Sequence, residues 1–159
     1  MILAIDPGSQ KSGIAYINPE NYRPRLAEKI SNTEVLEFIP EGDWTVVIEM
    51  VAHYGTGMPA GKTVFDTCVW IGRFYQHFHA LGFDVHLIYR SEVKMNLCGT
   101  MRAKDSNIRQ ALVDRFASGA SNYGKGTKKE PGWFYGFAAD MWQAYALGVT
   151  YIDSQKAPF

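Results

Sequence analysis

The sequence predicts an α/β fold in which helices cover a mixed sheet, and three observations lead to this class. Two short apolar runs, 2–5 and 13–17, flank a polar turn, as in an antiparallel pair of strands. The continuous apolar run 44–50 is typical of a strand that is buried on both faces of a sheet. Apolar residues then recur at helical spacing over 62–81, and further strand and helix signals follow it.

The other elements follow from periodicity and from Gly, Pro and capping residues. Residues 23–30 provide a third strand, which completes an antiparallel meander with the first two. Ser31 or Asn32 caps a short helix over 33–38, which ends before Pro40. The remaining elements are, in chain order, a strand at 83–89, a connection at 91–98, a helix over 104–117, a loop at 118–133 and a final helix over 138–152.

The predicted helix 62–81 is apolar on two sides. One stripe recurs in steps of three and four residues and consists of Val64, Cys68, Ile71, Tyr75 and Phe78. Val69, Trp70 and Phe74 add a second apolar surface. We therefore expect this helix either to be covered on two sides within the fold or to form a homodimer, in which a charged residue at Trp70 or Phe74 yields the monomer.

Composition limits the classes of protein to consider. The chain has 159 residues, 47% of them hydrophobic, which predicts a single domain over 1–159 with one buried core. Sixteen basic and sixteen acidic residues cancel, so a nucleic acid would be bound by a local basic patch. Two cysteines are too few for a disulfide framework, and no apolar run approaches the roughly 20 residues that span a bilayer. We expect a cytoplasmic protein with free thiols and no membrane partner.

Three acids occupy positions where a charge needs compensation. Asp6 ends the first strand, Glu49 lies in the apolar run 44–50, and Asp140 lies on the final helix. The small residues Ala144 and Gly148 on that helix allow it to approach the sheet closely and bring Asp140 toward the other two acids. Burying unpaired carboxylates costs several kcal/mol, and a divalent cation would compensate them. Oxygen ligands without a Cys or His set favour Mg2+ or Mn2+, and two such ions can hydrolyse a phosphodiester.

Three segments resemble the RuvC branch of the ribonuclease H-like superfamily, especially its small phage-encoded members: ILAIDPGSQKSGIAY, VVIEMVA and AADMWQAYAL. The resemblance extends over nearly the whole chain in consistent order and spacing. It implies a ribonuclease H-like fold with a five-stranded sheet, three strands antiparallel and two parallel. It also implies a homodimer, formed here through the helix 62–81, that cleaves four-way (Holliday) DNA junctions with Mg2+, or with Mn2+ in its place, and two metal ions. A phage-encoded member would act in the host cytoplasm.

The resemblance also implies roles for individual residues. Asp6, Glu49 and Asp140 match the metal ligands of the family, and Lys94 and Lys104 match two lysines at the scissile phosphate. Lys104 is the better match of the two and is counted with the catalytic residues. The family usually has an acid or a histidine three residues before the last aspartate, where this chain has Phe137. Asp105 and His53 are the candidates to complete the site.

Further DNA contacts are predicted outside the acids. His53 and Tyr54 follow Glu49 in a glycine-rich loop, where an aromatic ring can stack on an unpaired base. The basic residues Lys125, Lys128 and Lys129, together with Arg102, are suited to binding phosphates.

Other interpretations remain open at the level of sequence. Asp6 could start a turn, Asp140 could complement a helix dipole, and the lysines could be solvated surface residues. The chain could be a nuclease of forks or flaps, an RNA-processing ribonuclease H-like nuclease, or a junction-binding protein with a weakened active site. A sugar-kinase or actin-like ATPase begins with a similar strand pair, but it would need a second phosphate loop and a second domain.

Overall fold

The computed structural model describes residues 1–52 and 61–157. Its elements are, in chain order, β1 (Ile2–Asp6), β2 (Lys11–Ile17), β3 (Pro24–Ser31), α1 (Asn32–Glu37), β4 (Thr45–Met50), α2 (Lys62–Ala80), β5 (Asp84–Tyr89), α3 (Arg90–Cys98), α4 (Asp105–Phe116), the 3-10 turn η1 (Asn122–Gly124) and α5 (Met141–Lys156). Within the described residues, no helix is both long enough and apolar enough to cross a membrane.

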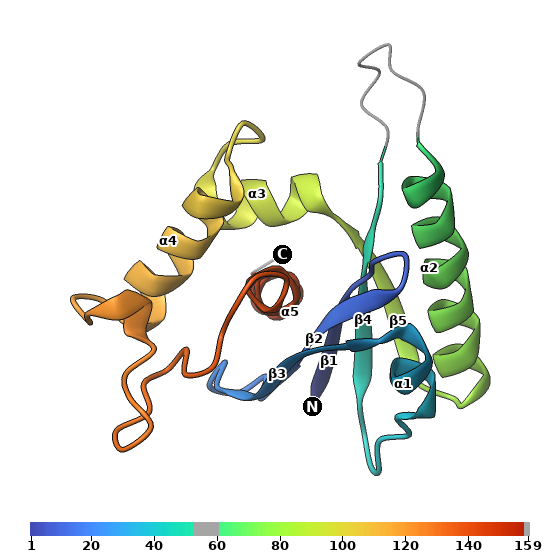
Figure 1. Cartoon of the computed structure of the whole chain (residues 1–159), viewed down its shortest axis with the longest axis horizontal. Helices are drawn as coiled ribbons and strands as arrows, with labels where there is room; N and C mark the ends of the chain where they lie inside the picture. The colour runs from blue at the N-terminus through green and yellow to red at the C-terminus, as the bar shows by residue number, and fades with distance from the viewer. Residues whose placement is uncertain (53–60, 158–159) are drawn as a thin grey trace.

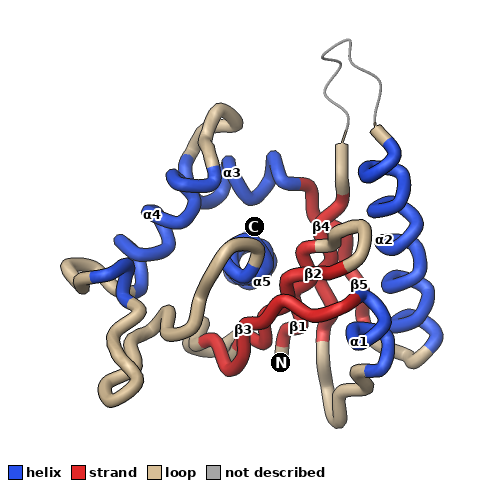
Figure 2. The backbone as a smooth tube through the Cα atoms, viewed as in Figure 1, coloured by secondary structure: helices blue, strands red, loops and turns tan. Residues whose placement is uncertain are grey.

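The strands form one mixed sheet in the order β3-β2-β1-β4-β5. The pairs β1–β2 and β2–β3 are antiparallel, and the pairs β1–β4 and β4–β5 are parallel. The predicted mixed five-stranded sheet is therefore confirmed, and so is the expectation that the strands of Asp6 and Glu49 are neighbours. Helices α3, α4 and α5 lie on one side of the sheet, and α1 and α2 lie on the other (Figures 1 and 2).

Helix α5 passes between the sheet and the helices α3 and α4 (Figure 1). Every residue from Trp142 to Ile152 is buried, because the helix is covered on all sides. Gly148 lies against Ile17 and Ala4 of the sheet, so closely that a side chain at this position would collide with them. The close approach predicted from the small residues of this helix is confirmed.

Helix α2 buries a line of residues that matches the predicted stripe only in part, at Ile71 and Phe78. Thr67, Ile71, Phe74 and Phe78 are buried, whereas Val64 and Tyr75 are exposed. The sheet face beneath α2 is lined by Leu3, Ile5, Val46 and Ile48. This apolar surface takes up the large ring of Phe74, so the buried line of the helix is rotated toward Phe74 relative to the stripe that periodicity favoured. Phe74 is therefore a core residue, and the prediction that it supports a dimer interface is wrong.

Two element assignments also differ from the sequence analysis. The expected connection at 91–98 is the helix α3, which starts directly after β5 and ends at Gly99 in a left-handed conformation. The last helix begins at Met141 and not at 138, because Phe137 and Phe134 turn into an aromatic core before it. In both cases tertiary packing decided the boundary, which local patterns place only to within a few residues.

Candidate functional site

The register of the sheet brings the predicted acids together. Asp6 pairs with Gly13 on β2, and Gly13 pairs with Lys29 on β3. On the other side of β1, the ladder runs to Ile5 and Ile48, so Asp6 and Glu49 are the next residues of neighbouring strands. Residues paired across strands point to the same face of a sheet. Lys29, Asp6 and Glu49 consequently form one row on the face that α5 covers.

Asp140 lies over this row, because it immediately precedes the first residue of α5, the helix that covers this face of the sheet. A β-carbon built on Gly13 would lie 2.7 Å from the carbonyl oxygen of Asp140 and 3.0 Å from its Cβ. Only glycine therefore allows the backbone at Asp140 to rest on β2 between Asp6 and Lys29. The Asp140 carboxylate forms an ion pair with the Lys29 ammonium.

The carboxyl groups of Asp6 and Glu49 both have raised pKa values. Burial and the neighbouring Glu49 carboxylate raise the pKa of Asp6 to about 8, although Arg90 opposes this shift. Burial also raises the pKa of Glu49, which is 8% exposed, against the effect of Arg90. Among the described residues, no hydrogen bond or ion pair involves the Asp6 carboxylate. The centre of the row therefore holds two carboxyl groups with insufficient positive charge around them.

Arg90 is the cation closest to Glu49. Its Nη1 donates to both carboxylate oxygens of Glu49, at 3.1 and 3.4 Å, and its Nη2 donates to Asp105 at the start of α4. Arg90 follows the carboxyl end of β5, and this end lies beside the end of β4 in the parallel ladder. The guanidinium thus links three elements at one edge of the site.

The loop after Asp6 is fixed by two buried polar residues. Ser12 donates a hydrogen bond to Asn32 Oδ1 at 2.6 Å, and Asn32 donates from Nδ2 to the carbonyl of Gly8 at 2.9 Å. The backbone N–H of Asn32 also donates to the carbonyl of Gln10. Satisfying these buried groups gives the loop one conformation and holds Asp6 at the end of β1.

The other predicted site residues occupy different positions. Lys94 lies on α3, and its charge partly offsets the rise in the pKa of Glu49 that burial causes. Lys104 is exposed and caps α4 next to Asp105, which contacts Arg90. Asp105, considered for completing the site, thus lies beside Glu49. Arg102, Lys125, Lys128 and Lys129 are on surface loops, while His53 and Tyr54 lie outside the described residues.

Phe137 does not face the acids. It is buried in an aromatic cluster and contacts the rings of Phe134, Trp142 and Tyr145, with centroids 5.1 to 5.5 Å apart. It also precedes the start of α5, so it does not lie one helical turn before Asp140 on the same helix. Within 1–52 and 61–157, no group of three or more Asp, Glu, His or Cys side chains is arranged to hold a metal ion.

Sequence reasoning missed Lys29, Arg90 and the Ser12–Asn32 pair. A signal existed for Arg90, because the ends of parallel strands meet at one edge of a sheet and Arg90 follows such a strand. Lys29 could be found only from the register of β2 and β3, which places it opposite Gly13. Asn32 was considered solely as a helix cap.

The contact between Gly13 and Asp140 leads to a prediction about stability. We expect Gly13→Ala to lower the free energy of unfolding by about 1–3 kcal/mol, because the added methyl group displaces the backbone at Asp140. Urea unfolding followed by circular dichroism measures this loss. Gly72→Ala is the matched control, since a β-carbon there meets no atom within 4 Å. Equal stability of the two variants would contradict the proposed close approach.

Comparison with known proteins identifies the fold as one that occurs in solved structures. No protein-family model matches the sequence, and no curated protein matches it. Two solved structures are similar over almost the whole chain. "Thermus thermophilus RuvC structure" has 17% identity and a TM-score of 0.63, covering 98% of this chain and 95% of that one. "T. thermophilus RuvC in complex with Holliday junction substrate" has 16% identity and a TM-score of 0.64, with 98% and 94% covered. The chain therefore has the ribonuclease H-like fold, in the form found in RuvC.

Proposed function

We propose that the protein is a metal-dependent endonuclease that hydrolyses phosphodiester bonds in branched DNA, with four-way junctions as its substrate. The observation that carries this proposal is the row of Asp6 and Glu49 on neighbouring strands, with Asp140 seated on Gly13 beside them. The likeness to a RuvC structure solved with Holliday junction substrate supports the choice of DNA.

Asp6, Glu49 and Asp140 are the proposed ligands of the metal. The site fits a hard divalent cation, because the half-buried Asp6 and the buried Glu49 offer oxygen donors, and because burial and the Glu49 charge together raise the pKa of Asp6. Since Asp140 forms an ion pair with Lys29, ligation by all three acids requires Asp140 to leave that lysine. Mg2+, or Mn2+ in its place, would activate water and neutralise charge at the phosphate, with two ions serving the attacking and leaving oxygens.

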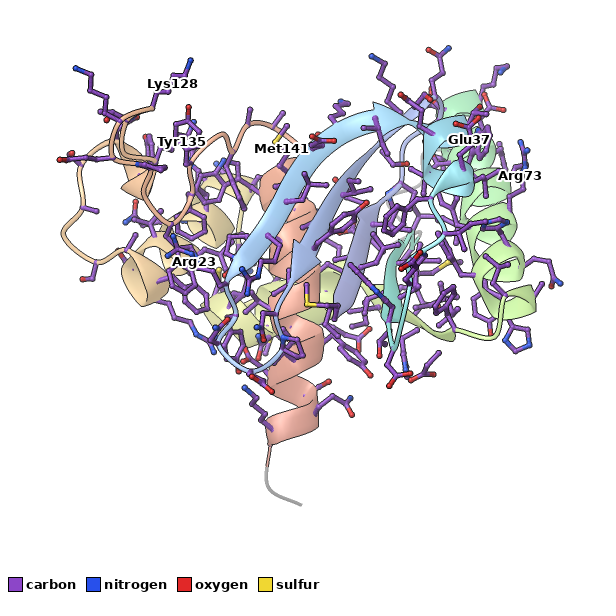
Figure 3. The ribbon with its side chains drawn as sticks, turned by 90° about the horizontal axis from the view of Figure 1, so that it is seen from below. Arg23, Glu37, Arg73, Lys128, Tyr135 and Met141 are labelled. Atoms are coloured by element: carbon purple, nitrogen blue, oxygen red, sulfur yellow. The ribbon has the colours of Figure 1, made fainter. Side chains whose placement is uncertain are left out.

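Basic side chains around the acids are proposed to hold the substrate. Lys94 and Lys104 would contact oxygens of the scissile phosphate as point charges, one from α3 and one from the start of α4. Lys125, Lys128 and Lys129, with Arg102, would contact phosphates farther along the DNA. Lys128 lies near the exposed Tyr135, at the opposite side of the molecule from Arg73 on α2 (Figure 3). The stacking role predicted for His53 and Tyr54 stays a prediction.

A homodimer through α2 is part of the proposal. Phe65 and Val69 lie one helical turn apart on α2 and are 62% and 61% exposed. They form an apolar strip on the face of the helix that points away from the sheet. A two-fold dimer that buries this strip would match the symmetry of a four-way junction.

We expect Val69→Glu to convert the dimer into a monomer, because a buried, unpaired carboxylate in the interface costs several kcal/mol. Size-exclusion chromatography with light scattering measures the mass. Met95→Glu is the control, because Met95 is an exposed apolar residue on a different helix. The interface is refuted if the Val69→Glu protein keeps the dimer mass, or if the wild type already has the mass of one chain.

Phe137 favours a second candidate, a junction-binding protein with a weakened active site. A buried phenylalanine cannot bind metal at the position where RuvC resolvases usually have an acid or a histidine, and Lys29 holds Asp140. Such a protein would bind junctions through the same basic residues and cut them slowly or not at all.

Cleavage of labelled DNA distinguishes the two candidates. Four-way junction, replication fork, flap and linear duplex are incubated with Mg2+ and with Mn2+, with Asp6→Asn as the control. Paired symmetric cuts in the junction alone, absent in the variant, support a resolvase. Equal cutting of forks and flaps indicates a broader branched-DNA nuclease. Tight junction binding without cleavage supports the junction-binding protein.

A further inference from the structure

A cleft opens beside the acids on the side away from Arg90. Its volume is about 530 Å³, and it is lined by Asp6 and Asp140, the loop 7–10, Lys11 and Lys29, and Thr63 and Thr67 at the start of α2. Arg90 and Lys94 line a separate, smaller cavity. The acids therefore lie between two groups of cations, one on α3 and α4 and one on β2 and β3.

The register places the two lysines of the cleft together. Lys11 pairs with Ser31, and Gly13 pairs with Lys29, so Lys11 and Lys29 are diagonal neighbours on the same face. Such neighbours are about 7–8 Å apart in an antiparallel pair. Both lysines are exposed, and Asp140 is the ion-pair partner of Lys29. Both lysines bring positive charge to the same cleft, and a phosphate bound there would be attracted by both.

We propose that Lys11 and Lys29 form a subsite for a backbone phosphate of the substrate strand, adjacent to the scissile phosphate. The subsite rests on the proposed nuclease function and extends it to a second phosphodiester. A strand whose scissile phosphate is held on one side by Lys94 and Lys104 continues past the acids into this cleft. When Asp140 leaves Lys29 to bind the metal, as the proposed ligation requires, the three donors of the Lys29 ammonium group can contact phosphate oxygens.

Salt-dependent binding gives the first test. Affinity for a four-way junction is measured by fluorescence anisotropy in EDTA, over a series of NaCl concentrations, for wild type, K11Q, K29Q and the double variant. Each substitution should weaken binding about fivefold and make the negative slope of log K against log [NaCl] shallower by about 1. The matched control is K156Q, at the far end of the 16-residue helix α5, about 24 Å from Asp140 along its axis.

A scan of neutral phosphates gives the second, more specific test. Junctions that carry one methylphosphonate at each position around the cut are bound to wild type and to the double variant. If the lysines contact one phosphate, neutralising that phosphate and replacing the lysines remove the same contact, so the two losses of affinity should not add. One neutralised phosphate next to the cut should weaken the wild type about fivefold or more and leave the double variant unchanged. General loss of positive charge would instead lower affinity equally at every position.

The outcomes separate this proposal from the nuclease function. If wild type binds and cuts junctions but the double variant shows the same methylphosphonate penalties, the subsite is refuted and the nuclease function stands. If wild type binds no DNA, both fail. K29R should restore most of the binding lost in K29Q, because a cation at this position is what the phosphate requires. Thermal melting of each variant shows whether it is folded.

Discussion

Replacing Asp6 by Asn should abolish DNA cleavage and, at the same time, stabilise the metal-free protein at pH 8. We expect cleavage in Mg2+ to fall at least about 100-fold, because the variant loses the carboxylate that is proposed to bind the metal at the centre of the row. The free energy of unfolding in EDTA should rise by about 3 kcal/mol at pH 8. A residue whose removal increases stability and eliminates activity is typical of a functional site.

The direction of the stability change follows from the pKa of Asp6. In the folded chain this pKa is raised to about 8, against 3.8 as the ordinary value. Between these two pH values the folded protein binds a proton at Asp6 that the unfolded chain has released. The free energy of unfolding therefore falls as pH rises from about 4 to about 8. Asn imitates the protonated acid, so the variant should lack this part of the pH dependence.

Urea unfolding of both proteins at pH 4, 6 and 8 in EDTA measures the effect. The two curves should converge at pH 4 and separate progressively above it. Adding Mg2+ at pH 8 should then stabilise the wild type and leave Asp6→Asn unchanged, since binding to the folded state alone adds stability. Equal stability of the two proteins at pH 8 would show that the carboxyl group carries no electrostatic cost.

Arg90→Ala should have the second large effect, a loss of about 2–4 kcal/mol in the free energy of unfolding at pH 8. Arg90 is the ion-pair partner of the buried Glu49 and also contacts Asp105. Without it, Glu49 loses its ion-pair partner, and Asp6 loses the positive charge that opposes the rise in its pKa. The loss should be smaller at pH 5, because the carboxyl groups can then take up protons.

Two further variants identify the cause. Arg73→Ala removes an arginine that stacks on Trp70 on the far side of the sheet and should cost little. Adding Glu49→Gln to Arg90→Ala should recover most of the lost stability, because the buried charge is removed with its partner. Similar losses for Arg73→Ala and Arg90→Ala, measured by urea unfolding, would contradict the role assigned to Arg90.

The local pattern of residues was sufficient to predict most of the architecture. The apolar runs 2–5, 13–17 and 44–50, bounded by polar turn residues, are strand signals that depend only on neighbours in sequence. The positions of Asp6 and Glu49 near the ends of two strands followed from these runs. Gly148 predicted the close packing of α5, because only a residue without a side chain permits it.

The partners of the acids, by contrast, were decided by the tertiary structure. Lys29 reaches Asp140 because the register of β2 and β3 places it opposite Gly13, and Arg90 reaches Glu49 because β5 lies beside β4. Neither fact is contained in a local period, since strand order and register depend on contacts between distant segments. The same reason explains why α2 buries Phe74 and exposes Val64. The sequence was thus sufficient to predict the acids and the elements that carry them. The cations that pair with these acids were decided by the packing of distant segments.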